Sequence, residues 1–167
     1  MRTYCMPFTE ENIEELNAGD MIYISGDIFC GRDAVLPQII KEITEGKLDS
    51  SINFKGNVMF HTAVSVAGVG PTSSNKLEIE SSMLTLSEAG IRMHLGKGKI
   101  KEETIKGLSE RKSVYAIIPP VTALLMNKTS NIKCVAHEEL GMEALYKITV
   151  DSYPVIIAGA KGRSIYK

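Results

Sequence analysis

Residues 69–98 carry the pattern that decides the fold and read VGPTSSNKLEIESSMLTLSEAGIRMHLGKG. A glycine–proline turn with several hydroxyl residues precedes an amphipathic run that stops at Gly90. A short apolar run then leads into a glycine loop at 96–98. The amphipathic run predicts a helix that includes residues 81–90, and the apolar run predicts a strand. A helix followed directly by a strand is typical of α/β proteins.

The chain on either side continues this alternation. Thr9 is a candidate N-cap, Pro37 marks the first turn of a second helix, and Gly46 stands where that helix should stop. Some strands follow one another without a helix, so the sequence predicts one α/β domain over residues 1–167 with a mixed sheet. Strands are expected at 20–26, 57–68, 113–120, 132–137, 144–150 and 154–160, and helices at 9–15, 35–47, 101–112 and 121–128.

Composition excludes several classes of protein. The 19 basic residues balance 20 acidic ones, so we expect no nucleic-acid partner and no membrane-surface binding. Aromatic residues make up 6% of the chain and tryptophan is absent, which argues against a stacking platform for single strands. The longest apolar stretch has 13 residues and contains two prolines, whereas a membrane span needs about 20.

The cysteines and histidines show no metal-binding spacing. Cys5, Cys30 and Cys134 are odd in number and far apart, which favours reduced thiols and a cytoplasmic location. No CxxC pair occurs, so we expect no zinc site and no self-contained iron–sulfur cluster on this chain. The three histidines are interpreted as lone structural or surface residues; they are His61, His94 and His137.

Three polar clusters follow predicted strands, namely GRD at 31–33, GPTSSNK at 70–76 and GKG at 96–98. Ligands in α/β sheets collect at the carboxyl ends of strands, where such loops meet. Arg32, Lys76 and Lys97 would then hold a small anion, a carboxylate or a phosphate, by charge-assisted hydrogen bonds. The hydroxyls of the second cluster would also cap the following helix. No phosphate-binding P-loop pattern is present.

The order of four motifs, ISGDIFCGRDA, GPTSSNKLE, HLGKG and ELGMEALYKITVDSYP, resembles the C-terminal domain of class I iron–sulfur fumarate hydratases. In two-subunit relatives, including L-tartrate dehydratase, that domain is a separate beta subunit. The resemblance implies a single swivelling β/β/α-type domain that docks on an alpha subunit. It also implies that the alpha subunit carries a [4Fe–4S] cluster, whose open iron acts as a Lewis acid on the hydroxyl of a small dicarboxylic hydroxy acid.

The same resemblance implies roles for individual residues. Thr72 would abstract the carbon-bound proton, and Lys97 would bind substrate and ease the deprotonation of Thr72. Arg32 would grip a carboxylate, with Asp33 orienting it. Further substrate-binding positions are Ser73, Lys76 and Gly96.

Two positions depart from the family pattern. Leu36 stands where the motif R-D-x-x-H has histidine, and Lys76 replaces an arginine whose fork a lysine does not reproduce. Three functions therefore stay open. The chain is the beta subunit of a hydro-lyase, or a catalytically retired paralogue that serves as a non-catalytic anion-binding or scaffolding domain, or a phosphate-binding module.

Overall fold

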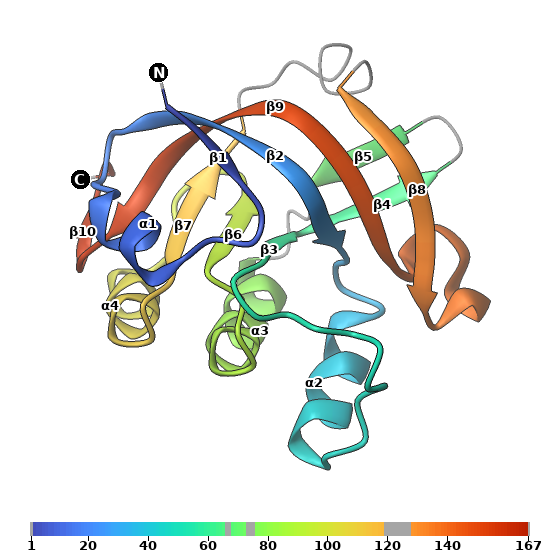
Figure 1. The fold of residues 1–167 in the computed structure, drawn as a ribbon. Coiled ribbons are helices and arrows are strands. Elements are labelled where there is room, and N and C mark those ends of the chain that lie inside the picture. Colours follow the sequence, from blue (N-terminus) through green and yellow to red (C-terminus); the bar gives the residue numbers. More distant parts are fainter. Residues whose placement is uncertain (1, 66–67, 73–75, 119–127, 167) are drawn as a thin grey trace.

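A computed structural model describes residues 2–65, 68–72, 76–118 and 128–166. Its main feature is a mixed sheet with helices against it, so the predicted α/β class is confirmed (Figure 1). Five strands run parallel in the order β1, β2, β3, β6 and β7. These strands are β1 (Thr3–Cys5), β2 (Met21–Cys30), β3 (Val58–Phe60), β6 (Met93–Gly96) and β7 (Val114–Ile117).

A single long strand, β9 (Leu145–Ala160), closes this sheet on itself. It pairs antiparallel with β7 and also with β2, so that Ile156 is the partner of both Ile117 and Met21. The sequence predicted two separate strands here, at 144–150 and 154–160, and that division is wrong. Ser152 adopts a positive φ of 51°, which bends the strand without ending it. Two further strands, β8 (Thr129–Ala136) and β10 (Arg163–Ser164), pair antiparallel with β9.

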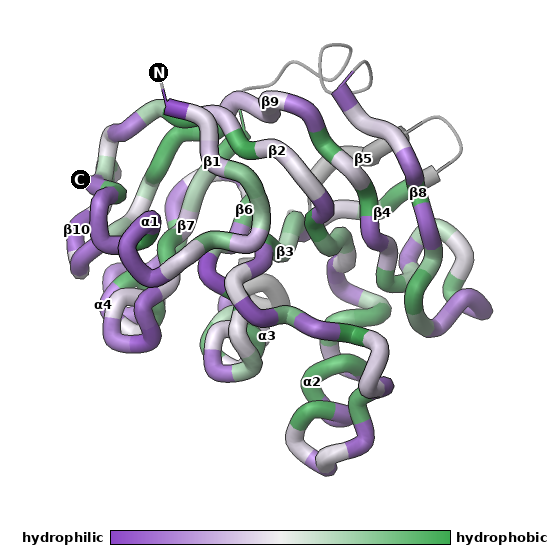
Figure 2. Tube along the Cα trace, viewed as in Figure 1, coloured by the Kyte–Doolittle hydropathy of each residue, from purple (hydrophilic) through white to green (hydrophobic). Residues whose placement is uncertain are grey.

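Apolar side chains fill the inside of this ring and the layer between sheet and helices. One buried cluster includes Ile22, Phe60 and Leu95 from three parallel strands. Two further clusters join the outer face of the sheet to the helices α2 (Leu36–Thr44), α3 (Lys76–Glu88) and α4 (Glu102–Glu110). Figure 2 shows hydrophobic segments along the central strands and hydrophilic ones on α4. None of the described helices is long and apolar enough to cross a bilayer.

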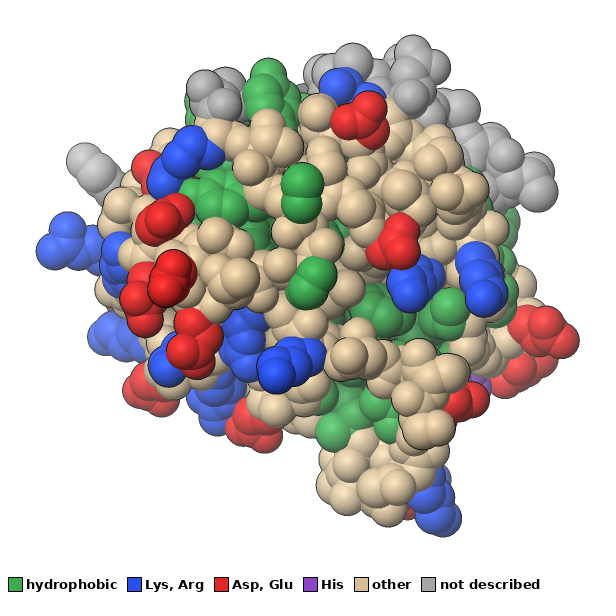
Figure 3. Space-filling model, in the orientation of Figure 1, with side chains coloured by type: hydrophobic (Ala, Val, Ile, Leu, Met, Phe, Trp, Pro, Cys, Tyr) green, Lys and Arg blue, Asp and Glu red, His purple; other side chains and the backbone are tan. Residues whose placement is uncertain are grey.

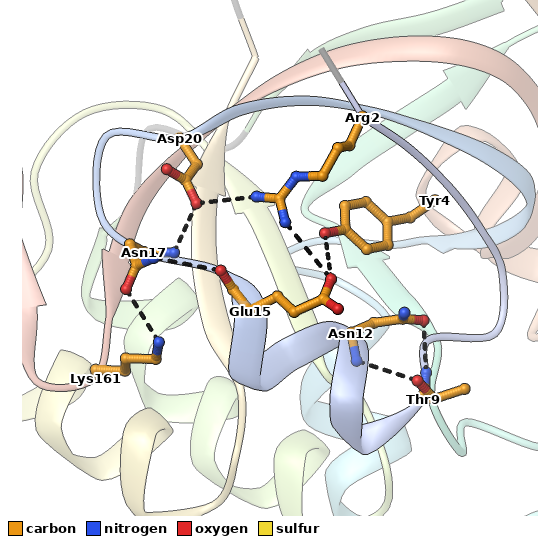
Figure 4. Close-up of polar contacts among 8 residues, drawn as sticks. All are labelled: Arg2, Tyr4, Thr9, Asn12, Glu15, Asn17, Asp20 and Lys161. Carbon is orange, nitrogen blue, oxygen red and sulfur yellow. Dashed lines mark hydrogen bonds and ion pairs between the residues drawn. The ribbon is translucent and has the colours of Figure 1, made fainter.

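The helix boundaries largely follow the predicted signals. Pro37 lies in the first turn of α2, and Gly46, with φ of 70°, follows its end. Helix α1 (Glu10–Glu15) begins at Thr9, whose hydroxyl accepts a hydrogen bond from the Asn12 amide at 3.1 Å while the Asn12 side chain accepts from the Thr9 amide at 3.0 Å (Figure 4). The predicted N-cap is therefore confirmed as a reciprocal capping box. The predicted helix at 121–128 falls on residues 121–127, outside the described residues, and on a turn at 128.

Two expectations about strands need correction. The chain at 69–72 was expected to form a turn, but together with Gly68 it forms strand β5 (Gly68–Thr72), paired antiparallel with β4 (Thr62–Ser65). Proline is tolerated there because the two form a separate small sheet in which β5 is an edge. Strand β2 was expected to end at Gly26, but it continues to Cys30 through an irregularity at Ile24 and Gly26.

The interpretation of His61 and His94 as lone residues is also wrong. Both side chains are fully buried between the sheet and α3, with His61 Nε2 3.1 Å from His94 Nδ1. His94 Nε2 lies 2.9 Å from the Ser87 hydroxyl of α3. Burial lowers the pKa of His61 to about 3 and that of His94 well below its ordinary value, so both rings are neutral near pH 7.

The third histidine, His137, joins α2 to the 3₁₀ helix η1 (Glu138–Glu143) that follows it. Its Nε2 lies 2.8 Å from a carboxylate oxygen of Glu42, and its Nδ1 lies 3.3 Å from Glu139. The hydrogen bond with Glu42 is the main cause of a raised His137 pKa. A protonated His137 therefore ties the segment before η1 to α2.

The buried histidine pair predicts non-additive mutational effects. Replacing His94 with leucine leaves the His61 ring nitrogen and the Ser87 hydroxyl without this partner, so the free energy of unfolding should fall by about 1–3 kcal/mol. The double variant His61→Leu with His94→Leu should lose less than the two single losses added together, because it also removes the orphaned ring. Urea unfolding of the four proteins measures this coupling, and strictly additive losses would contradict it.

The contact between His137 and Glu42 predicts a pH dependence. The folded-state pKa of His137 lies above its unfolded value near 6.5, so the stabilisation is complete below pH 6.5 and is lost as the pH rises through the folded pKa. The His137→Asn variant, which tolerates the positive φ of 56° at this position, should be less stable than the parent by about 1 kcal/mol near pH 6. That difference should shrink towards pH 9. A stability difference that stays constant from pH 6 to pH 9 would rule this contact out as its source.

Candidate functional site

Strands β2, β3 and β6 reach the same edge of the sheet, and residues at their carboxyl ends lie side by side in one row. Cys30 pairs with Phe60, and Phe60 pairs with Leu95, in parallel register. Adjacent strands lie about 4.8 Å apart, so the three backbones leave the sheet within about 10 Å of one another. Arg32 and Lys97 each follow this row by two residues. The GRD and GKG loops therefore begin at the same edge of the sheet, as predicted.

The hairpin of β4 and β5 brings the third cluster to this edge. Thr62 follows Phe60 of the same row by two residues, and it is the register partner of Thr72. The backbone of Thr72 is thus placed between the starts of the two other loops, because β3 lies between β2 and β6. Helix α3 begins four residues later, at Lys76. Ser73 lies outside the described residues.

Arg32 is held by a residue far away in the sequence. Its Nε and Nη2 both donate to Glu143 Oε1, at 2.8 Å and 2.6 Å. Both side chains are about one quarter to one third exposed, and the hydrogen bond to Glu143 is the main cause of a raised Arg32 pKa. Asp33, exposed in the same turn, adds a smaller electrostatic contribution in the same direction. Glu143 is a site residue to which the sequence analysis gave no role, although it lies in the matching ELGMEA motif.

The ELGMEA motif forms the tight turn that presents Glu143. Gly141 has φ of 60° and ψ of −124°, a conformation that strongly favours glycine. Its carbonyl accepts hydrogen bonds from the Ala144 amide at 3.1 Å and from the Tyr146 hydroxyl at 2.9 Å. The second oxygen of Glu143, Oε2, is buried and has no hydrogen-bond partner among the described residues. This turn fixes Glu143 against Arg32 and leaves one carboxylate oxygen unpaired there.

The GKG loop is supported from beneath by Tyr115. The Tyr115 hydroxyl donates to the Gly98 carbonyl at 2.9 Å, and Gly98 has a positive φ of 73°. A Cβ atom on Gly96 would lie 3.1 Å from the same hydroxyl, so the first glycine leaves room for the tyrosine. Burial raises the pKa of Tyr115, which keeps its hydroxyl protonated and able to donate. Lys97, between the two glycines, is exposed.

Glu80 of α3 ties the chain after this loop to the helix that follows the hairpin. Its Oε1 accepts from the Lys101 amide at 2.8 Å and from the Thr104 hydroxyl at 2.6 Å, at the start of α4. A carboxylate at this position satisfies helix amides and complements the helix dipole. The start of α4, which follows the GKG loop, is therefore tied to α3.

Leu36, at the position where the family motif has histidine, lies in an apolar environment. Leu36 is 3% exposed and packs in the core cluster on the α2 side of the sheet. It offers no hydrogen bond to a ligand. Lys76 is placed at the first residue of α3.

The cysteines of this chain do not fit a [4Fe–4S] cluster. Cys5, Cys30 and Cys134 lie on β1, β2 and β8, and the last two are separated by β9 because both are partners of Tyr146. Burial raises the pKa of the Cys30 thiol, whereas a cluster ligand must be a thiolate. Within the described residues, no group of three or more metal-ligating side chains is present.

Comparison with known proteins finds relatives over most of the chain. The putative L(+)-tartrate dehydratase subunit beta of Methanocaldococcus jannaschii is 29% identical over 95% of this chain and 88% of its own length. The L(+)-tartrate dehydratase subunit beta of Escherichia coli K12 is 27% identical over 91% of this chain and 79% of its own. The anaerobic class I fumarate hydratase of the same strain is 28% identical over 86% of this chain, which spans only 28% of that enzyme. The family model described as Fumarase C-terminus matches residues 3–167, so the chain belongs to the Fumarase C-terminus family.

Proposed function

We propose that this chain is the beta subunit of a class I iron–sulfur hydro-lyase. With a cluster-bearing alpha subunit it would add water to, or remove water from, a small dicarboxylic hydroxy acid. The observation that carries the proposal is the common edge at which the backbones of Arg32, Thr72 and Lys97 leave the sheet. Relatives that this chain matches over most of both lengths are named as tartrate dehydratase beta subunits. The [4Fe–4S] cluster belongs on the partner in this proposal, because the cysteines here do not fit one.

In this reaction the chain would bind the two carboxylates of the substrate and transfer one proton. Arg32, kept in place by Glu143, binds one carboxylate of the acid, and Lys97 binds the other. In dehydration the Thr72 alkoxide takes the proton from one carbon, and the substrate hydroxyl on the adjacent carbon leaves as hydroxide with its bonding electrons. The hydroxide then takes that proton from the Thr72 hydroxyl, directly or through solvent. A carbon–carbon double bond and water result, and the alkoxide is restored. An alkoxide is costly to form, and the ammonium of Lys97 lowers that cost.

A non-catalytic anion-binding domain is the second candidate, and one observation favours it. Leu36 fills the family's histidine position with a core side chain, so one polar group of the family pattern is missing. A phosphate-binding module is the third candidate, and it predicts that inorganic phosphate raises the melting temperature more than malate does. The hydro-lyase predicts the reverse order.

Anaerobic co-purification with the alpha subunit, followed by assays of malate–fumarate and tartrate–oxaloacetate interconversion, tests the proposal. We expect turnover of one of these pairs by the complex and none by the chain alone. An intact complex with a full cluster and no turnover of either pair would remove both reactions.

Thr72 is the residue whose replacement separates an enzyme from a scaffold. In the assembled complex, Thr72→Ala should lower kcat by about 10²- to 10⁴-fold with little change in KM, because it removes the proton acceptor. Thr72→Ser should keep most of the activity. Thr3→Ala, an exposed threonine on β1, serves as the matched control. Equal kcat values for the Thr72→Ala and Thr3→Ala complexes would assign the hairpin to a non-catalytic role.

Glu143 is proposed as a positioning residue that acts through Arg32. Glu143→Gln keeps the shape of the side chain but removes the charge that orients the guanidinium. The KM for the dicarboxylate should rise about tenfold while kcat changes less, since a charged hydrogen bond contributes about 1.5–3 kcal/mol. Glu138→Gln, an exposed neighbour on η1, is the control. A similar KM for the two variants would show that Arg32 does not depend on this contact.

A further inference from the structure

A groove of about 600 Å³ opens on the face formed by β2, β9 and β8. Figure 3 shows basic side chains beside apolar ones on this face. The connection between α2 and β3 forms its other wall through Ser51 and Ile52. Neither Arg32 nor Lys97 lines the groove. Charged and apolar side chains both line it, among them Phe29, Ile132, Lys133, Val135 and Lys147.

Two lysines stand directly opposite each other in this groove. Lys133 of β8 is the register partner of Lys147 of β9, and both line the same cavity. Side chains so placed have Cβ atoms about 5 Å apart, and like charges in that arrangement destabilise a sheet. The next residue across in register is Phe29, and Lys147 Nζ lies 5.9 Å from the centre of its ring. The row therefore joins two cations to an aromatic side chain.

No acid in the described residues neutralises these lysines by an ion pair. Among the described residues, Asp27 is the only carboxylate that lines the groove, and its Oδ1 accepts from the Thr149 hydroxyl at 2.6 Å. Thr149 and Asp27 are register partners in a neighbouring row, two residues along each strand from Lys147 and Phe29. The two lysines thus give their row a positive charge, whereas the Asp27 carboxylate further along the groove is hydrogen-bonded to Thr149. An anion bound at the row would relieve the repulsion between the lysines.

We propose that this groove is a second binding site, for a small organic acid whose carboxylate sits between Lys133 and Lys147 and whose apolar body lies along the wall. The body would contact Val135 and the exposed Ile132, which is 40% exposed on the edge strand β8. A cavity of this size lies within the range of about 300–1,000 Å³ typical of small-molecule sites. The proposal does not depend on the hydro-lyase assignment, because it uses none of that site's residues.

Titration of the isotopically labelled chain with hexanoate, followed by amide NMR shifts, tests the site. Hexanoate supplies one carboxylate and an apolar tail. We expect saturable shifts confined to β8, the middle of β9 and the chain around Ser51, weaker shifts with acetate, and none with hexylammonium. Lys147→Met should weaken hexanoate binding roughly tenfold, the loss of one charge-assisted contact. Lys106→Met, an exposed lysine on α4, should leave the binding unchanged.

Three results would overturn the proposal. The first is that hexanoate shifts amides all over the surface, and the second is that it binds the Lys147→Met and Lys106→Met variants equally well. A Lys133→Met variant that associates with itself but binds hexanoate normally would show that this lysine only protects an edge strand. If Lys147→Met fails to fold, Lys133→Met carries the test alone, because Lys133 is exposed at the edge of the sheet.

Discussion

Backbone hydrogen bonding in register across β2, β3 and β6 is the constraint on which the rest of the structure depends. It sets Cys30, Phe60 and Leu95 in one row, so that the loops after these strands begin together. The buried side chains of Phe60 and Leu95 fill the ring that β9 closes, which fixes this row against sliding. A slip of one residue would turn each of these core side chains to the other face. The candidate site thus inherits its geometry from the core.

Charge is the second determinant of the site. The guanidinium of Arg32 meets the carboxylate of Glu143 at the end of η1, and the two residues are 111 positions apart in sequence. That contact fixes the orientation of a cation that would otherwise have several rotamers. The same turn leaves Glu143 Oε2 buried and unpaired among the described residues, a state that costs free energy unless a donor approaches. Two hydrogen bonds to the backbone hold the neighbouring segments in place. Tyr115 donates to the carbonyl of Gly98 in the GKG loop, and Glu80 accepts from the Lys101 amide just before α4.

Sequence patterns predicted the helix boundaries, because these depend on interactions between residues close together in the chain. Pro37 and Gly46 bound α2, Thr9 caps α1, and the run at 101–112 contains α4, because each depends on residues within one or two helical turns. The segment at 69–72 looked like a turn because glycine and proline usually break strands, and only its pairing with β4 shows otherwise. The contacts of His61 with His94 and of Arg32 with Glu143 join residues 33 and 111 positions apart, and no spacing pattern records such pairs. The ELGMEA motif marked the segment but not the role of its last glutamate.

The central claim is that the loops of Arg32, Thr72 and Lys97 form one site for a single dicarboxylate. Amide NMR of the labelled chain in complex with an unlabelled alpha subunit, titrated with malate, measures this most directly. The account predicts that the amides of all three loops shift along curves that fit the same dissociation constant. Three different dissociation constants, or shifts in only one loop, would contradict it.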